Sequence, residues 1–396
     1  MKGSKRLDKV TTYYFAKKLA EIARMNATQD VEVINLGVGS PDLLPPKSVI
    51  ETLNSSSHLV DANKYQSYRG IPLFRNSVSE WYNRHFGIEV NSPDEILPLL
   101  GSKEGIMHLH MSMLDEGDEV LVPNPGYPAY SMTALLAGGI PRYYNLTEAG
   151  SWLPNIEKLE QQDLSKVKIM WINYPHMPTG ARIDIETMQS LVDFAKRNEI
   201  LLCHDNPYIF ILNDNPMSIF QVKGAKDCCV ELISMSKCYN MAGWRIGAMI
   251  GNADILNTVL KFKSNMDSGM YKPLQIAAAK ALSIDRSWFD ELNEIYARRR
   301  KIAFEIMNAL DAEYDEDSAG MFVWGKVPSF VSCVENFCDD LLLKSNVFIT
   351  PGHIFGSNGE GYIRVSLCND KDILHQALDR IKTTNANRTT EKSSQV

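Results

Sequence analysis

The chain lacks the basic excess that a nucleic-acid-binding protein carries. Its 396 residues contain 41 Lys and Arg against 48 Asp and Glu, which gives a formal net charge of -7 at pH 7. A surface that holds nucleic acid neutralises phosphates with clustered basic side chains. We therefore expect no nucleic-acid partner.

Long apolar runs and paired cysteines are also missing. No stretch reaches the about 18 apolar residues of a membrane-spanning helix, and no apolar signal core follows the basic N-terminal segment. The seven cysteines include no Cys-x-x-Cys pair and no Cys/His metal spacing. These absences predict a cytoplasmic protein with reduced thiols, no membrane partner and no metal site.

The composition that remains is that of a globular protein. Hydrophobic residues make up 44% and charged residues 22% of the chain, which is ordinary for a folded soluble protein. The length is sufficient for two domains.

Short apolar runs alternate with helical patterns through the middle of the chain. Near-continuous apolar strands separated by helices predict a mostly parallel sheet with helices on both faces. Ligands of such sheets bind outside the carboxyl ends of the strands, so we expect the chemistry in the loops that follow them. The expected strands are Glu119–Val122, Ile140–Tyr144, Lys168–Asn173, Ile200–His204, Val230–Ser234 and Arg245–Ile250, and the expected helices include Glu104–Leu114, Ile185–Arg197 and Ala253–Lys263.

The last third of the chain predicts a second, smaller α+β domain. A long charged helix at Ser287–Leu310 precedes strands at Met321–Trp324 and Tyr362–Ser366. We expect residues 1–44 and 286–382 to form this small domain and residues 45–285 to form the large one. Residues 383–396 are polar without apolar periodicity, which predicts an unstructured tail.

The clearest chemical pattern is the segment from Ser234 to Gly247, which follows an apolar strand. It holds Lys237 behind Ser-Met-Ser and places Arg245 before the next apolar run. A lysine that is desolvated near cationic groups has a lowered pKa and suits imine formation. In an arbitrary sequence such a lysine is more often a surface residue. The other motifs of the chain therefore decide whether Lys237 is a reactive lysine.

This segment resembles the lysine motif of the class I and II aminotransferases, fold-type I enzymes that use pyridoxal 5'-phosphate (PLP). The resemblance implies a large domain with a mostly parallel seven-stranded sheet between helices, and a smaller α+β domain. It also implies that Lys237 is the catalytic lysine that forms the Schiff base, and that Ser234, Ser236 and Arg245 bind the cofactor's phosphate. Arginine suits phosphate because its fork gives charge-assisted hydrogen bonds.

A second motif, His204-Asp-Asn-Pro-Tyr208, follows the strand Ile200–His204. PLP withdraws electrons effectively while its ring nitrogen stays protonated, which requires a carboxylate partner. The resemblance makes Asp205 that partner and Tyr208 a hydrogen-bond donor to the phenolic oxygen. Alone, an aspartate at this place would more often cap a helix.

A Gly-flanked turn, Gly101-Ser-Lys-Glu-Gly105, opens a helical run. Helix N-termini present free N–H groups to phosphates, and by the resemblance Ser102 and Lys103 contact the cofactor's phosphate. Neither GxxxxGK[ST] nor GxGxxG after a strand occurs, so a nucleotide-binding loop is excluded.

Two tyrosine-containing segments complete the implied cofactor site. In Asn124-Pro-Gly-Tyr127-Pro-Ala-Tyr130, the resemblance makes Tyr127 the ring that stacks on the cofactor, and we expect Tyr130 to serve packing. Tyr65 matches a residue that crosses a dimer interface to touch the phosphate bound by the other subunit. The resemblance thus implies a homodimer with shared active sites.

The substrate site is implied by an arginine in the strand Tyr362–Ser366. A buried arginine needs a carboxylate partner from the protein or from a ligand. The resemblance makes Arg364 the group that binds the amino acid's α-carboxylate, with Gly39 close to the same carboxylate. The resemblance to the aminotransferases covers roughly residues 30 to 370, and its motifs occur in the family's order.

One position departs from the family pattern. The turn Asn173-Tyr-Pro-His-Met177-Pro-Thr-Gly180 resembles an Asn-Pro-Thr-Gly turn whose asparagine donates to the phenolic oxygen. Met177 stands in its place and cannot donate. Asn173, four residues earlier, is the candidate that compensates.

The implied activity is transfer of an amino group between an L-amino acid and a 2-oxo acid by a ping-pong mechanism. Tyr13 belongs to a segment that resembles the N-terminus of LL-diaminopimelate aminotransferases and is a candidate substrate contact, while aspartate, alanine and diaminopimelate all stay open as substrates. A PLP-dependent C–S lyase would share nearly every motif. A non-catalytic PLP-sensing regulator would need a DNA-binding module, for which the segment before the aminotransferase pattern leaves no room.

Overall fold

The computed structural model describes residues 3–393, with side chains described as far as Ala386. Seven strands form one sheet in the order β2-β8-β7-β6-β5-β3-β4. Strands β7 to β4 pair in parallel, while β8 runs antiparallel to β7 and β2. This confirms the mostly parallel seven-stranded sheet. Its strands are β2 (Ile96–Leu99), β3 (Glu119–Asn124), β4 (Ile140–Asn145), β5 (Val167–Ile172), β6 (Leu201–Asp205), β7 (Cys229–Ser234) and β8 (Gly247–Gly251).

Helices cover both faces of this sheet, and alternating side chains of the strands supply two apolar cores. In β5, Ile169 and Trp171 join a core with α4, α5 and α10, whereas Met170 and Ile172 join a core with α7. This alternation follows from the two-residue repeat of a strand. The helices of this part are α2 (Lys47–Ser56), α3 (Pro72–Phe86), α4 (Ser102–Met113), α5 (Ala129–Ala137), α6 (Ile156–Glu160), α7 (Ile185–Arg197), α8 (Ala225–Cys228), α9 (Met235–Cys238), α10 (Ala253–Met266) and α11 (Lys272–Leu282).

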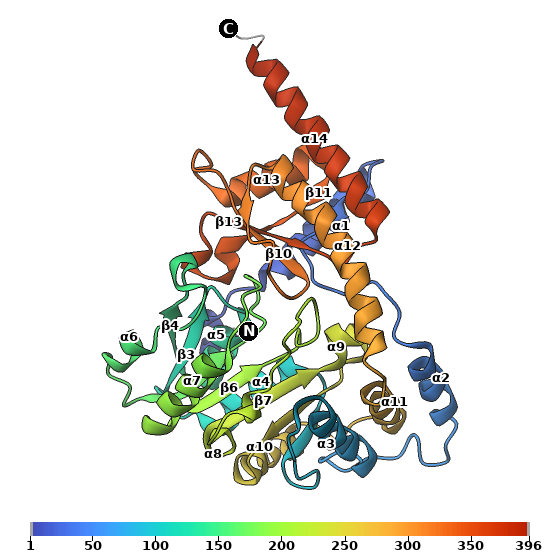
Figure 1. The fold of residues 1–396 in the computed structure, drawn as a ribbon, viewed down its shortest axis with the longest axis vertical. Coiled ribbons are helices and arrows are strands. Elements are labelled where there is room, and N and C mark those ends of the chain that lie inside the picture. The colour runs from blue at the N-terminus through green and yellow to red at the C-terminus, as the bar shows by residue number, and fades with distance from the viewer. Residues whose placement is uncertain (1–2, 394–396) are drawn as a thin grey trace.

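The C-terminal part carries a second, antiparallel sheet in the order β12-β13-β10-β9. The N-terminal segment joins this part, because β1 pairs in parallel with β11. Figure 1 shows this part above the seven-stranded sheet, with α14 projecting beyond it. Its elements are α1 (Tyr14–Thr28), β1 (Ile34–Asn35), α12 (Ser287–Ala309), β9 (Glu313–Tyr314), β10 (Phe322–Lys326), α13 (Val334–Ser345), β11 (Val347–Phe348), β12 (Thr350–Pro351), β13 (Tyr362–Ser366) and α14 (Lys371–Ser393). None of the helices in the described residues is both long and apolar enough to cross a membrane.

Two details of the predicted sheet are corrected. The sequence did not predict β2, which contains Pro98; this strand lies at the edge of the sheet, where the missing N–H of proline is tolerated. Arg245 was predicted as the first residue of a strand. It instead has a φ of 54°, in the left-handed region, and β8 begins two residues later at Gly247.

The polar segment predicted as an unstructured tail continues α14 as far as Ser393. The preceding turns of α14 are packed against the rest of the protein through the buried side chains of Leu374 and Ile381. Asn385 Nδ2 donates to the carbonyl oxygen of Ala309 at 2.6 Å. A helix that is already nucleated and packed extends with one backbone hydrogen bond per added residue, so polar residues can follow it. Residues 394–396 of the predicted tail lie outside the described residues.

A buried carboxylate joins several elements under the strand ends. In β7, Glu231 Oε1 accepts hydrogen bonds from Tyr82 Oη at 2.7 Å and Ser218 Oγ at 2.8 Å. Its Oε2 accepts from Ile219 N at 3.0 Å and lies 2.7 Å from His204 Nδ1. Burial alone would raise the pKa of Glu231, but the hydrogen bonds and charge of His204, together with Tyr82, bring that pKa below its ordinary value.

We predict that Glu231→Gln lowers the free energy of unfolding by about 3 kcal/mol, because it leaves buried donors without their charged partner. Urea denaturation at pH 7 measures this difference. Because the folded-state pKa is depressed, the stabilisation is present above the unfolded value of about 4.3 and is lost as the pH falls further, so the two proteins should converge in acid. The exposed Glu291→Gln is the control, and an equal, small effect of both substitutions would contradict the prediction.

Candidate active site

The loops at the carboxyl ends of the central strands and segments of the C-terminal part surround one cavity of about 350 Å³. Every predicted site residue except Tyr65 lines it. These residues are Tyr13, Gly39, Ser102, Lys103, Tyr127, Asn173, Met177, Asp205, Tyr208, Ser234, Ser236, Lys237, Arg245 and Arg364. The cavity therefore lies where ligands of parallel sheets are expected, outside the carboxyl ends of the strands.

Lys237 lies in the short helix α9, directly after β7. Its Nζ donates a hydrogen bond to the carbonyl oxygen of Gly39. Burial lowers the pKa of Lys237, and the positive charges of Arg364 and Arg245 lower it further. Lowering the pKa of an amine increases its uncharged fraction, and the uncharged form is the one that can act as a nucleophile or accept a proton.

Asp205 ends β6 and is almost completely buried. Its Oδ2 accepts a hydrogen bond from the Tyr130 hydroxyl at 2.9 Å, while its Oδ1 has no partner among the described residues. Burial raises the pKa of Asp205 to about 6, against the hydrogen bond from Tyr130 and the charges of His204 and Lys237. A buried carboxylate oxygen without a partner is unfavourable, so this atom suits an N–H group of a ligand.

The start of α4 and Arg245 form a cup for an anion. Gly101 has a φ of 85°, and a Cβ at this position would collide with the guanidinium of Arg245. Arg245 Nη1 donates to the carbonyl oxygen of Ala242 at 3.0 Å and lies 3.5 Å from Ser236 Oγ. The hydrogen bonds of Arg245 go to backbone carbonyl and hydroxyl oxygens, and no carboxylate of the described residues pairs with it. Helix N–H groups and a guanidinium without a carboxylate partner therefore meet here, as a phosphate requires.

Arg364, in β13, is only 3% exposed and has no carboxylate partner within the described part of the chain. Its Nη2 donates to the carbonyl oxygen of Gly37 at 2.7 Å, and its Nη1 lies 3.0 Å from Met177 Sδ. Its Nε has no hydrogen-bond partner in the part of the chain that the structure describes. The ring centroids of Phe322 and Phe355 lie 3.9 and 4.6 Å from the guanidinium carbon. Burial lowers the pKa of Arg364 to about 10. A buried cation with free N–H groups is suited to a carboxylate ligand.

Asn173 connects the turn that carries Met177 to the end of β6. Its Oδ1 accepts from Met177 N at 2.8 Å, and its Nδ2 donates to the carbonyl oxygen of Asp205 at 2.6 Å. An amide nitrogen carries two hydrogens, so one remains for a ligand in the cavity. The thioether of Met177 contacts Arg364 instead of offering a donor.

Tyr65 lies outside the cavity. It is 90% exposed, in the loop between α2 and α3, and Val60 in the same loop is 97% exposed. This side chain makes no contribution to the cavity of its own chain.

The sequence reasoning missed the hydroxyl of Tyr130 and the phenylalanine rings around Arg364. Tyr130 was expected to serve packing, yet it binds Asp205. The available signal was its place three residues after Tyr127, where one turn joins the two residues: Tyr130 N donates to the carbonyl oxygen of Tyr127 at 3.1 Å. Phe322 and Phe355 come from distant segments, so no local pattern joins them to the site.

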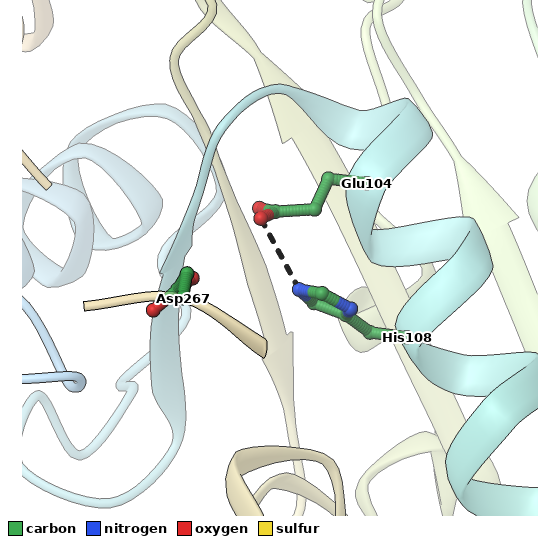
Figure 2. Close-up of side chains that lie close together, drawn as sticks. All are labelled: Glu104, His108 and Asp267. Carbon is green, nitrogen blue, oxygen red and sulfur yellow. Dashed lines mark ion pairs between the residues drawn. The ribbon is translucent and has the colours of Figure 1, made fainter. Parts of the chain in front are cut away.

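A cluster of possible metal ligands includes two side chains of α4. The ligand atoms of Glu104, His108 and Asp267 lie within 4.8 Å of one another, and His108 Nε2 is 3.3 Å from Glu104 Oε1. Figure 2 shows Glu104 and His108 facing one another from one side of α4, with Asp267 opposite them. The ammonium of Lys263, which has no exposed surface, forms an ion pair with Asp267. This cluster therefore holds a cation of its own, which would repel a metal ion.

Comparison with known proteins decides the family. Residues 31–381 match the family model described as aminotransferase class I and II. The chain belongs to this family. It is a PLP-dependent aminotransferase, an enzyme that moves amino groups between amino acids and 2-oxo acids.

Relatives of the aminotransferase cover nearly its whole length. It is 40% identical to an LL-diaminopimelate aminotransferase of Dehalococcoides mccartyi over 370 residues, which cover 93% of this chain and 95% of the relative. It is 38% identical to the LL-diaminopimelate aminotransferase of Aquifex aeolicus over 381 residues, with coverage of 96% and 98%. The substrate-bound structure of BacF from Bacillus subtilis superposes with a TM-score of 0.93 at 33% identity and coverage of 97% and 98%. Neither a lyase nor a regulator has support among these relatives.

Three features of the cavity of the aminotransferase are suited to PLP. The unpartnered Asp205 Oδ1 suits a protonated ring nitrogen, the cup at Gly101 suits a phosphate, and Lys237 presents an amine. Once bound, PLP supplies an aldehyde that condenses with amines and a ring that withdraws electrons from the substrate.

Proposed function

We propose that the aminotransferase acts on an amino acid with a second, distant carboxylate, such as LL-diaminopimelate. The observation that carries this proposal is a pair of cations in one cavity, neither with a carboxylate partner among the described residues. Arg364 is buried, whereas Lys103 is exposed, with its Nζ 4.8 Å from the ring centroid of Tyr13. Arg364 would bind the α-carboxylate beside Gly39, and Lys103 with Tyr13 would bind the distal one.

The space around Lys103 supports a long substrate. A second cavity of about 550 Å³ shares Tyr13, Phe15, Lys103, Tyr127 and Phe355 with the first. The two cavities adjoin at these side chains, so a substrate that reacts at Lys237 would extend past Lys103 into the second one. This room, and relatives that are named for LL-diaminopimelate, favour diaminopimelate over aspartate and alanine.

The remaining site residues receive roles from their positions. Lys237 Nζ would take the proton from the substrate's Cα and return it, because it lies in the cavity and its lowered pKa favours the uncharged amine. Tyr208 and the free amide hydrogen of Asn173 would donate to the phenolic oxygen, where Met177 offers no donor. Asp205 would hold the ring nitrogen protonated, and Tyr127 would cover the ring. The phosphate would be held by Ser102, Ser234, Ser236, Arg245 and the backbone N–H of Lys103.

We also propose that the enzyme is a homodimer with shared active sites. The loop before α3 exposes Val60, Tyr65 and Tyr68 at 97%, 90% and 43%, an apolar surface that a second copy would cover. In that dimer Tyr65 would reach the phosphate site of the partner subunit. The isologous symmetry of a dimer gives each site one such tyrosine.

The domain division and the compartment complete the proposal. A large domain of residues 45–285 and a small domain of residues 1–44 and 286–382 are supported by the pairing of β1 with β11. A cytoplasmic location is supported by the seven cysteines, all free thiols.

We predict that Lys103→Met lowers kcat/KM for LL-diaminopimelate about 30-fold, because a charge-assisted hydrogen bond to the distal carboxylate is lost. The same substitution should leave single-turnover reaction with alanine within about threefold of the unchanged enzyme. Stopped-flow absorbance of the cofactor measures both donors. Lys17 is an exposed lysine that lines the second cavity, and Lys17→Met is the control. An equal loss for both donors would assign the Lys103 side chain to the cofactor's phosphate and refute the substrate proposal.

The dimer proposal is tested by mixing inactive subunits. Lys237→Ala and Tyr65→Phe subunits should regain about a quarter of full activity when they are unfolded and refolded together, since half of the dimers are hybrids with one intact site. A mixture of Lys237→Ala with Asp205→Ala is the control. Both residues belong to the same chain's cavity, so no hybrid site is intact. Absence of recovery in the first mixture, with both single variants inactive, would contradict shared sites.

A further inference from the structure

Tyr130, in α5, is a fully packed tyrosine whose hydroxyl is not explained by packing. It is 1% exposed, and its hydroxyl donates to Asp205 Oδ2 at 2.9 Å. A phenylalanine would fill the same space without burying a polar group. Buried hydroxyls are kept where they make a needed hydrogen bond, and a bond to a carboxylate is among the stronger ones.

A buried polar network fixes the plane of the Tyr130 ring. The ring stacks on Trp171 with centroids 4.9 Å apart and 5° between the planes. Trp171 Nε1 donates to His110 Nε2 at 2.8 Å, so the proton of the neutral imidazole lies on Nδ1, which is 2.8 Å from Thr133 Oγ1. Thr133 Oγ1 in turn donates to the carbonyl oxygen of Ala129 at 2.6 Å. Burial lowers the pKa of His110 to about 3, so this arrangement of donors persists at neutral pH.

The Tyr130 ring also meets Tyr127. Their centroids lie 5.6 Å apart with the planes at 89°, an edge-to-face contact. One side chain therefore contacts both Asp205 and Tyr127, which approach the cavity from β6 and from the loop after β3.

We propose that Tyr130 is a positioning residue that keeps Asp205 ionised, directs its free oxygen Oδ1 toward the cofactor's ring nitrogen, and supports Tyr127. By occupying Oδ2, the hydroxyl leaves Oδ1 as the one acceptor of the carboxylate that faces a ligand. The inference rests on the role proposed above for Asp205. Without the hydroxyl, Asp205 is easier to protonate, and the proton shared with the ring nitrogen moves toward the carboxylate.

The test is Tyr130→Phe, which keeps the ring and removes the hydroxyl. The dissociation constant of PLP, measured by equilibrium dialysis with the full-length enzyme, should rise about tenfold. With PLP labelled at its ring nitrogen, the ¹⁵N resonance should move from the protonated position toward that of neutral pyridine. Tyr144→Phe is the matched control, because that buried hydroxyl donates at 2.7 Å to the backbone of Trp171 and does not touch Asp205. It should leave both measurements unchanged.

A cofactor analogue separates electrostatic positioning from packing. In 1-deaza-pyridoxal phosphate a C–H replaces the ring nitrogen, so Tyr130→Phe should not weaken its binding. An equal weakening of PLP and the analogue, or a response equal to that of Tyr144→Phe, would show that Tyr130 only packs. Asp205→Asn is measured in parallel, and its failure to weaken PLP binding would refute the role of Asp205 itself.

Discussion

The site depends on an imbalance of charge in one cavity. Four basic side chains line it, Lys103, Lys237, Arg245 and Arg364, whereas Asp205 is the one carboxylate among its described lining residues. Cations without partners are unfavourable away from bulk water. Asp205 alone cannot balance these charges, and no other carboxylate lines the cavity among the described residues. The remaining negative charge therefore has to come with the ligands. A phosphate at the helix N-terminus and carboxylates at Arg364 and Lys103 satisfy this requirement.

The fold sets where each charge lies. The parallel strands β5, β6 and β7 bring the Asn173 turn, Asp205 and Lys237 to one edge of the sheet, and β13 of the C-terminal sheet places Arg364 opposite them. Below this edge, Glu231 gathers four donors and thereby fixes the end of β6 beside Asp205. The cavity therefore requires both sheets, since neither one alone carries all of its charges.

Much of this arrangement could be predicted from the sequence, for identifiable physical reasons. The helix Ile185–Arg197 and the strand Tyr362–Ser366 were predicted with their observed bounds, because period-3.6 and period-2 patterns are local. Residues with a motif of their own, such as Lys237 and Arg364, also reached the cavity as expected.

What the sequence did not predict depends on contacts between distant segments. The role of Tyr130 follows from Asp205, which lies 75 residues away. The rings around Arg364 come from β10 and from the segment after β12. The edge strand β2 was not predicted because it contains Pro98, which is unfavourable inside a strand. The polar end of α14 is helical because the earlier turns of that helix are packed.

The account is tested most directly by locating the lysine that binds the cofactor. Borohydride reduction of the PLP-loaded enzyme makes the link between cofactor and lysine permanent, and peptide mass spectrometry then identifies the labelled residue. The account predicts label on Lys237, whose Nζ lies in the cavity with Asp205 and whose pKa burial lowers. Label on Lys103 or on the buried Lys263, with Lys237 unmodified, would contradict it.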